Sequence, residues 1–230
     1  MATVIVANDL VGVGKVALTS SLPIMSACQT EVLPLPTVLL SSHTGEFENI
    51  YMRDLTDDLK GFYKQWEHLD FTVDGLVSGY FKSREELKIV GQLARDKRIA
   101  LFVDPIMGDN GRLYQGFDME YVEAMKDFCQ QADAIIPNLT EASLLTDSPY
   151  LEVGSYDKAT VDKLLRDLTK LGPRKVVLTG ISFEEGKIGL AYFDKETNKT
   201  TYLMRKSYKS HFYGSGDLVT AILASGYFHI

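Results

Sequence analysis

The residues best suited to chemistry lie near the C-terminal end, in Gly214-Ser215-Gly216-Asp217. An apolar run from Leu218 onward follows directly, so the glycines predict a tight turn that opens a helix. Backbone N–H groups at such a helix start attract an anion, and a carboxylate beside them could accept a proton from a hydroxyl. Phosphoryl transfer to an alcohol needs this combination. As structure alone, Asp217 is equally well explained as a helix N-cap behind a glycine loop.

Two further clusters carry oxygen ligands. Asp104 ends a predicted strand before Pro105, which keeps its backbone extended and turns its carboxylate toward the loops. Asn138 and Glu141 stand at a predicted helix start. Their spacing fits a helix cap with a returning glutamate, and it fits equally a pair of ligands for hydrated Mg²⁺.

Two more polar segments follow predicted strands. The hydroxyl of Thr44 and the imidazole of His43 are suited to a polar substrate, although such a loop could equally cap strand-end carbonyls. Tyr80 could form one wall of a pocket for a ring, or it could be an ordinary core tyrosine. In parallel sheets ligands bind at the carboxyl ends of the strands, which is where all these clusters fall.

The elements that must position these residues alternate along the chain. This alternation predicts an α/β fold, a three-layer sandwich whose central sheet is mostly parallel with helices on both faces, and a small antiparallel hairpin near the C-terminal part. Pro34 and Pro36 predict that the second strand is an edge strand or a broken one. The predicted strands are 3–7, 32–40, 73–77, 99–103, 134–136 and 175–178, the hairpin joins 188–193 to 200–204, and the helices are 15–28, 55–69, 83–97, 119–131 and 161–171. Ser83 and Glu86, three residues apart, predict a capping box at the start of the helix 83–97.

The first glycine segment, residues 12–17, supports two weaker interpretations. It is not a P-loop, because Asp9 stands where that motif needs glycine and Val16 where it needs serine or threonine. It does fit the dinucleotide pattern with alanine last, which keeps a nicotinamide-dependent oxidoreductase open as an alternative. The acid that should hold the ribose, Glu31, precedes the second strand instead of ending it. A simple turn that packs strand against helix explains the glycines as well.

Composition narrows the class of protein. The chain has 230 residues and a formal net charge of −7, which argues against binding to the phosphate backbone of nucleic acid. No apolar run has the length of a membrane span, and the N-terminus lacks the basic region and cleavage site of a signal peptide. The expected location is the cytoplasm, where Cys28 and Cys129 are expected to stay free thiols.

Taken in order, these motifs resemble the ribokinase superfamily, and within it the pyridoxal kinase branch. The resemblance covers nearly the whole chain and is specific in combination. Its motifs are Gly214-Ser215-Gly216-Asp217, the acidic segment 104–109, Asn138-Leu139-Thr140-Glu141, the segment from Leu33 through Thr44, and Ser78-Gly79-Tyr80.

The resemblance implies an ATP-dependent kinase that phosphorylates the 5′-hydroxymethyl group of pyridoxal, pyridoxine or pyridoxamine. It implies that Asp217 is the catalytic base and that the N–H groups of 214–216 hold the γ-phosphate. The remaining roles concern the substrates. Asn8, Thr44 and Tyr80 would bind the B6 vitamer, Asp104, Asn138, Glu141 and Thr179 would bind the nucleotide, and Asp104 and Glu141 would serve Mg²⁺, mostly through water.

The same resemblance implies a single kinase domain over residues 1–230 that lacks the family's usual C-terminal helices. It implies ATP and Mg²⁺ as cofactors, with a K⁺ requirement left open, and a homodimer by analogy. Two alternatives stay open beside it. One is a hydroxymethylpyrimidine or sugar kinase of the same superfamily, and the other is a catalytically inactive relative that only binds B6 vitamers.

Overall fold

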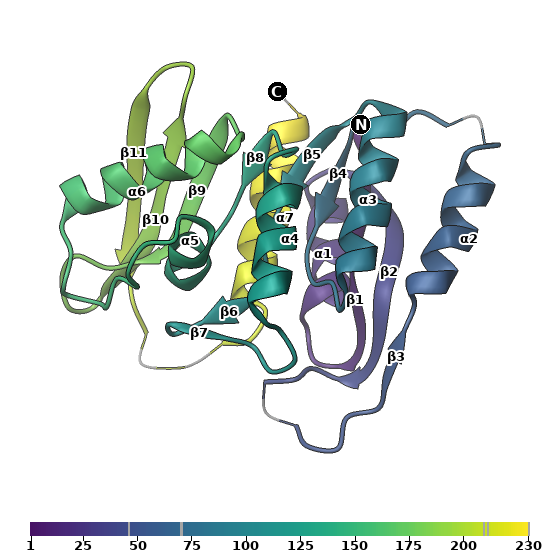
Figure 1. The fold of residues 1–230 in the computed structure, drawn as a ribbon, viewed down its shortest axis with the longest axis horizontal. Coiled ribbons are helices and arrows are strands. Elements are labelled where there is room, and N and C mark those ends of the chain that lie inside the picture. Colours follow the sequence, from purple (N-terminus) through teal and green to yellow (C-terminus); the bar gives the residue numbers. More distant parts are fainter. Residues whose placement is uncertain (46, 70, 209, 211, 230) are drawn as a thin grey trace. The chain divides into compact units, whose positions relative to one another are not determined.

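A computed structural model describes residues 1–45, 47–69, 71–208, 210 and 212–229 (Figure 1). The chain divides into two compact units, which are described separately below. The first unit is Met1–Asp104 together with His211–Ile230, and the second is Pro105–Ser210. The expectation of one kinase domain over the whole chain stays a prediction.

The first unit is built on a sheet with the strand order β5-β4-β1-β2-β3. The strands β5, β4, β1 and β2 run parallel, and the short β3 is antiparallel to β2. Val4, Ile5, Val6 and Ala7 in β1 are all buried, as expected for a central parallel strand covered on both faces. The strands are β1 (Thr3–Val13), β2 (Glu31–Ser42), β3 (Met52–Asp54), β4 (Gly75–Ser78) and β5 (Ala100–Val103).

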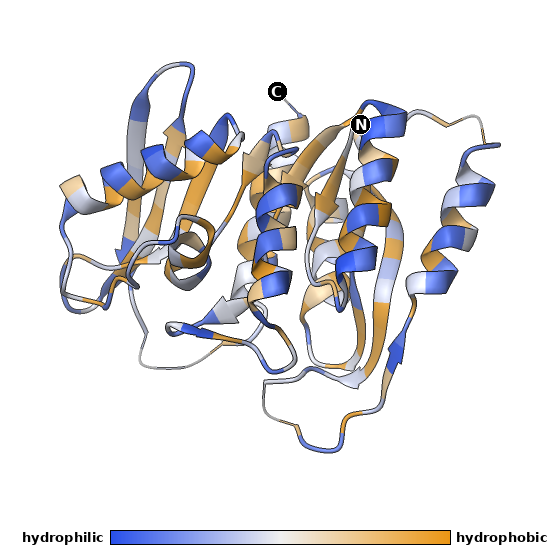
Figure 2. Cartoon of the chain, in the orientation of Figure 1, coloured by the Kyte–Doolittle hydropathy of each residue, from blue (hydrophilic) through white to orange (hydrophobic). Residues whose placement is uncertain are grey.

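Helices cover both faces of this sheet. The helices α1 (Ala17–Ala27) and α7 (Ser215–Phe228) pack against each other on one face, and α2 (Thr56–Trp66) and α3 (Arg84–Lys97) pack together on the other (Figure 1). The outward sides of α2 and α3 are hydrophilic, whereas the strands beneath them are apolar (Figure 2). The capping box predicted at the start of α3 is present, because Ser83 and Glu86 exchange side-chain to backbone hydrogen bonds.

One prediction about the first strands was wrong, and one was confirmed. Gly12 and Val13 do not form a turn but continue β1, where a Cβ on Gly12 would lie 2.8 Å from the Ser41 carbonyl oxygen. The glycine permits close approach of two strands, and this extended backbone does not provide the turn of a dinucleotide motif. The second strand is continuous through both prolines. Its proline-containing part pairs with β1 alone, because β3 pairs only with residues 38–40, so that part is an edge as predicted.

The second unit contains a mixed sheet with the order β11-β10-β9-β8. The strands β8 and β9 are parallel, and β10 and β11 form the predicted antiparallel hairpin. A small separate hairpin, β6 (Gly108–Asp109) with β7 (Arg112–Leu113), was not predicted. The larger elements are α4 (Met119–Cys129), β8 (Ala134–Ile135), α5 (Leu139–Leu145), α6 (Lys158–Leu171), β9 (Lys175–Ile181), β10 (Lys187–Asp194) and β11 (Lys199–Lys206).

The predicted fold class, an α/β fold with a mostly parallel sheet and a small hairpin, is confirmed. Helix boundaries differ from the predicted ones by a few residues, as in α1, which begins at Ala17. Within the described residues, no helix combines the length and the apolar character that crossing a lipid bilayer would require.

Candidate active site

The turn before α7 has the conformation that only glycine adopts easily. Gly214 is the N-cap of α7 with φ of 78°, in the left-handed region. A Cβ at this position would lie 2.4 Å from the carbonyl oxygen of Lys15, so a side chain is excluded twice, by conformation and by contact. Among the described residues, no side chain caps the start of α7. The first N–H groups of α7, from Ser215 onward, are therefore not satisfied by a cap and suit an anion.

Asp217 lies in the first turn of α7 and is partly buried. The amide nitrogen of Asn8 donates to its Oδ1 over 3.4 Å. Burial raises the pKa of Asp217, and hydrogen bonds from the Ala17 backbone and from Asn8 oppose that rise without cancelling it. The alternative of a plain N-cap is therefore not what the structure contains, because the N-cap position belongs to Gly214.

Asn8 and Asp9 are buried side by side where the pairing of β1 with β2 shifts register between Asn8 and Leu10. Asn8 Oδ1 accepts hydrogen bonds from the backbone N–H groups of Tyr80, at 2.7 Å, and Asp9, at 3.0 Å. Burial and the negative charge of Asp217 raise the pKa of Asp9 to about 7. Asn8 therefore connects the segment after β4 to Asp217, the residue that the resemblance identifies as the catalytic base.

Asp104 ends β5 as predicted and is buried. Its backbone N–H donates to the Ser78 carbonyl, and its Oδ2 accepts a 2.7 Å hydrogen bond from Thr220 Oγ1. Burial raises the pKa of Asp104, the Thr220 hydroxyl lowers it, and the charge of Asp217 raises it further. Three carboxylates, Asp9, Asp104 and Asp217, thus have raised pKa values in this unit, and Asp217 is an electrostatic neighbour of both others.

The predicted substrate residues Tyr80 and Thr44 lie in the loops after β4 and β2. Burial, followed by the charges of Asp9 and Glu86, raises the pKa of Tyr80 to about 12, so its phenol stays neutral. Thr44 is exposed in a turn. Its neighbour Gly45 accepts a hydrogen bond of 3.1 Å from the hydroxyl of Tyr213, the residue before the Gly214 turn.

In the second unit, the structure contains the helix cap that was one of the two interpretations of Asn138 and Glu141. Asn138 Oδ1 accepts from the N–H groups of Thr140 and Glu141, and Glu141 Oε2 accepts from the Asn138 N–H at 2.8 Å. Glu141 Oε1 also accepts from the Met107 N–H at 3.2 Å, and the Asn138 amide donates to the Gly108 carbonyl. Both carboxylate oxygens therefore already accept backbone hydrogen bonds.

Thr179 differs from its predicted position after the strand. It lies within β9, and its N–H donates to the Pro137 carbonyl over 2.9 Å beside a bridge to Asn138. Thr179 therefore belongs to the same strand-end region as the Asn138 cap. Pairing with β10 extends β9 beyond the apolar run that predicted its end at Leu178.

Sequence reasoning missed Asp9 and Thr220 as site residues. Asp9 is a mismatch to a P-loop, but an acid just beyond an apolar strand was also a usable signal of a site residue. Thr220 is one turn after Asp217 on α7, which places both on the same helix face. Across the described residues, no group of three or more histidine, cysteine, aspartate or glutamate side chains is arranged to hold a metal ion directly.

Comparison with known proteins agrees with this geometry. A family model described as phosphomethylpyrimidine kinase matches residues 55–229. The pyridoxal kinase of Arabidopsis thaliana is 26% identical over 205 residues, which cover 84% of this chain and 63% of that protein. The chain therefore spans less than two thirds of the length of this curated relative.

Solved structures extend the similarity to the whole fold. The crystal structure of pyridoxal kinase from Lactobacillus plantarum is 34% identical with a TM-score of 0.91, covering 100% of this chain and 81% of that one. A Bacteroides thetaiotaomicron protein assigned to the phosphomethylpyrimidine kinases, solved with pyridoxal, is 32% identical with a TM-score of 0.93. That match covers 99% of this chain and 80% of the other. The resemblance inferred from the motifs is confirmed, and the chain belongs to the phosphomethylpyrimidine kinase family, in which its relatives include pyridoxal kinases.

Proposed function

We propose that this chain carries an ATP-dependent kinase activity that phosphorylates the 5′-hydroxymethyl group of pyridoxal, pyridoxine or pyridoxamine. The observation that carries the proposal is the N-terminus of α7. There the uncapped turn at Gly214 stands beside Asp217, a partly buried carboxylate whose pKa burial raises. The similarity to pyridoxal kinases supports the choice of acceptor, and the pyridoxal in the Bacteroides structure is consistent with it.

In this reaction Asp217 accepts the proton of the acceptor hydroxyl while the hydroxyl oxygen forms its bond to the γ-phosphorus. The bond from that phosphorus to the β-γ bridging oxygen breaks, and ADP leaves. An alcohol is too weak an acid for Asp217 to ionise beforehand, so the proton moves late. A raised pKa makes Asp217 a stronger base than an ordinary aspartate.

Two groups of residues support this step. The backbone N–H groups of Gly214, Ser215 and Gly216 hold the oxygens of the transferring phosphoryl group, where negative charge must be stabilised. Asn8 and Thr44 bind polar atoms of the acceptor ring, and Tyr80 lines its pocket. Asn8 supports this assignment because its amide already joins Asp217 to the Tyr80 backbone.

Magnesium fits these residues through water rather than by direct contact. Asp104 is a buried carboxylate whose raised pKa leaves its charge poorly compensated by the protein alone, which suits a nearby cation. Glu141 holds the backbone N–H groups of Met107 and Asn138, so it would serve a hydrated Mg²⁺ through water and not as a direct ligand. We assign Asp104 and Glu141 to the magnesium end, and Asn138 and Thr179 to the nucleotide. Bound Mg²⁺ would neutralise charge on the phosphates.

An ADP-release assay tests the proposal, with pyridoxal, a hydroxymethylpyrimidine and ribose as acceptors, ATP, Mg²⁺, and Asp217→Asn as the blank. Turnover that is fastest with pyridoxal supports the proposal. Faster turnover with the pyrimidine would reassign the acceptor, which is the alternative that the name of the matched family favours. Binding of pyridoxal without ADP release would identify an inactive relative. The single domain and the homodimer stay predictions of the resemblance, and the cytoplasmic location stays a prediction from the composition.

A further inference from the structure

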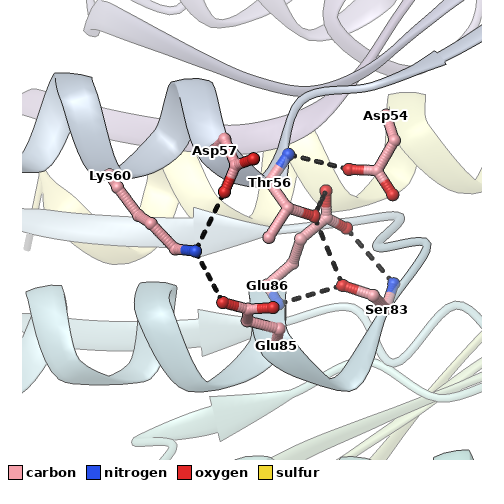
Figure 3. Close-up of polar contacts among 7 residues, drawn as sticks. All are labelled: Asp54, Thr56, Asp57, Lys60, Ser83, Glu85 and Glu86. Atoms are coloured by element: carbon pink, nitrogen blue, oxygen red, sulfur yellow. Dashed lines mark hydrogen bonds and ion pairs between the residues drawn. The ribbon is translucent and has the colours of Figure 1, made fainter.

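One buried carboxyl of the first unit has no part in the proposed chemistry. Glu86, in the first turn of α3, has 0% of its surface exposed. Its Oε2 accepts from the Lys82 N–H at 2.7 Å. The same oxygen accepts from the Ser83 N–H at 3.4 Å, while Ser83 Oγ accepts from the Glu86 N–H (Figure 3). Burying a carboxyl group costs free energy, so the capping of α3 alone does not explain why Glu86 is fully buried.

Glu86 also reaches the start of a second helix. Its Oε1 accepts a hydrogen bond of 3.3 Å from Thr56 Oγ1, at the first residue of α2 (Figure 3). The Thr56 N–H is in turn held by Asp54 Oδ1 at 2.8 Å. Asp118 and Asp157, which cap α4 and α6, accept N–H groups of their own helix and are exposed. Glu86 differs from them because it joins the first turns of two helices.

The segment that Glu86 holds is the one that carries Tyr80. The Tyr80 N–H donates to Asn8, and its carbonyl accepts a 2.8 Å hydrogen bond from Thr37 Oγ1. Phe81 is fully buried, and the next two N–H groups are those held by Glu86. The backbone after β4 is therefore held by Asn8 at Tyr80 itself and by Glu86 at the two residues that follow Phe81.

We propose that Glu86 is a positioning residue for the acceptor site: by holding the N–H groups of Lys82 and Ser83 it fixes Tyr80 as the wall against which the acceptor ring packs. The inference rests on the proposed function, which assigns that wall to Tyr80. Glu86 touches neither substrate. Its loss should therefore weaken acceptor binding while leaving the nucleotide and the proton transfer unaffected.

The test compares Glu86→Ala and Glu86→Gln in steady-state kinetics with pyridoxal and ATP varied separately. Glu86→Ala should raise the KM for pyridoxal on the order of tenfold, the effect of losing one strong hydrogen bond, with kcat and the KM for ATP within about twofold of wild type. Glu86→Gln should restore the KM, because its amide oxygen can accept from Lys82 while its NH₂ group donates to Thr56. Tyr80→Ala with Glu86→Ala should be no worse than Tyr80→Ala alone.

The matched control is Asp118→Ala, which removes a helix cap in the other unit and should lower the Tm without changing the KM for pyridoxal. An unchanged KM in Glu86→Ala, or equal increases in both KM values, would overturn the inference and leave the proposed function intact. If Glu86→Ala does not fold, Glu86→Met takes its place, because it keeps the length of the side chain but has no oxygen to accept from Lys82 and Ser83. A KM for pyridoxal that does not rise at least twofold in Glu86→Met overturns the inference. No turnover by the wild type with any acceptor would instead overturn the proposed function, and the inference with it.

Discussion

The acids around the start of α7 and the acid in the cap of α5 have opposite surroundings. In the first unit, Asp9, Asp104 and Asp217 are desolvated and have few hydrogen-bond donors, so their pKa values are raised. In the second unit, Glu141 is buried, and a backbone N–H is bound to each of its oxygens. Donors alone do not keep a pKa low, since Glu86 of the first unit accepts from three groups and burial still raises its pKa to about 7. The supply of donors instead decides whether a buried acid is left to take a proton or is occupied in holding the backbone. An acid short of donors is a good base, and one saturated with donors holds the backbone in place.

The largest expected effect is on Asp217→Asn, which removes the base but keeps the shape. We expect turnover to fall about 10²–10⁴-fold, the range for general-base catalysis, with ATP affinity near that of the wild type. Stability should not fall, since an amide suits a desolvated position better than a charge. An ADP-release assay beside a thermal melt measures both. Turnover above one tenth of wild type would reject Asp217 as the base.

The same exchange of carboxylate for amide in the second unit should lower the stability of the protein. In Glu141→Gln, one of the N–H groups of Asn138 and Met107 must face an NH₂ group instead of an oxygen. We expect the free energy of unfolding to fall by about 1–3 kcal/mol, the cost of an unsatisfied buried donor. Urea denaturation measures it. If the two substitutions, Glu141→Gln and Asp217→Asn, changed the free energy of unfolding equally, the contrast between these two acids would be lost.

Gly214→Ala tests whether the turn itself is required. The left-handed φ and the 2.4 Å approach to the Lys15 oxygen should cost about 1–2 kcal/mol of stability. Gly216→Ala is the matched control, because a Cβ there meets nothing within 4 Å. As a residue of the helix, that alanine should stabilise by about 0.5–1 kcal/mol. The two melting temperatures should therefore move in opposite directions, and a shared direction would contradict the described turn.

The smallest effect concerns pH. The folded state raises the pKa of Asp9 from 3.8 to about 7, so folding favours the protonated carboxyl. Its contribution to stability is complete below the pKa of the unfolded chain and is lost as the pH rises toward 7. Asp9→Asn does not titrate, so its stability relative to wild type should increase between pH 4 and pH 8, by about 1 kcal/mol or more. Urea denaturation at several pH values measures this, and a flat difference would show that Asp9 is not desolvated.

The sequence predicted those features of the structure that depend on residues close together in the chain. The Ser83 and Glu86 pair located the start of α3, and the alternation of strands and helices gave the fold class. Both interpretations of Asn138 and Glu141 were drawn from the sequence, but spacing alone could not choose between them. The structure contains the cap, whereas the role of the pair at magnesium stays a prediction. The further contacts with Met107 and Gly108, which lie far from the pair in the chain, could not be predicted from the spacing.

What the sequence could not give depends on distant contacts. The strand β1 runs on through polar residues because β2 pairs with it as far as Val13. The burial of Asp9, and the hydrogen bond that joins Thr220 to Asp104 across 116 positions, exist only once the sheet and α7 are assembled. The roles assigned to Asp217, Thr44 and the other site residues stay predictions until the substitutions are made.

The register shift in β1 has a consequence for how such a chain can diversify. Asn8 and Asp9 are part of the strand β1, which lies between β2 and β4. An insertion there would shift the register of β1 by one residue and move its following side chains to the opposite face of the sheet. Thr44 lies in an exposed turn, where a side chain can change without disturbing the sheet. Changes of acceptor preference in evolution should therefore come from substitutions in this turn, while the sequence of β1 stays the same.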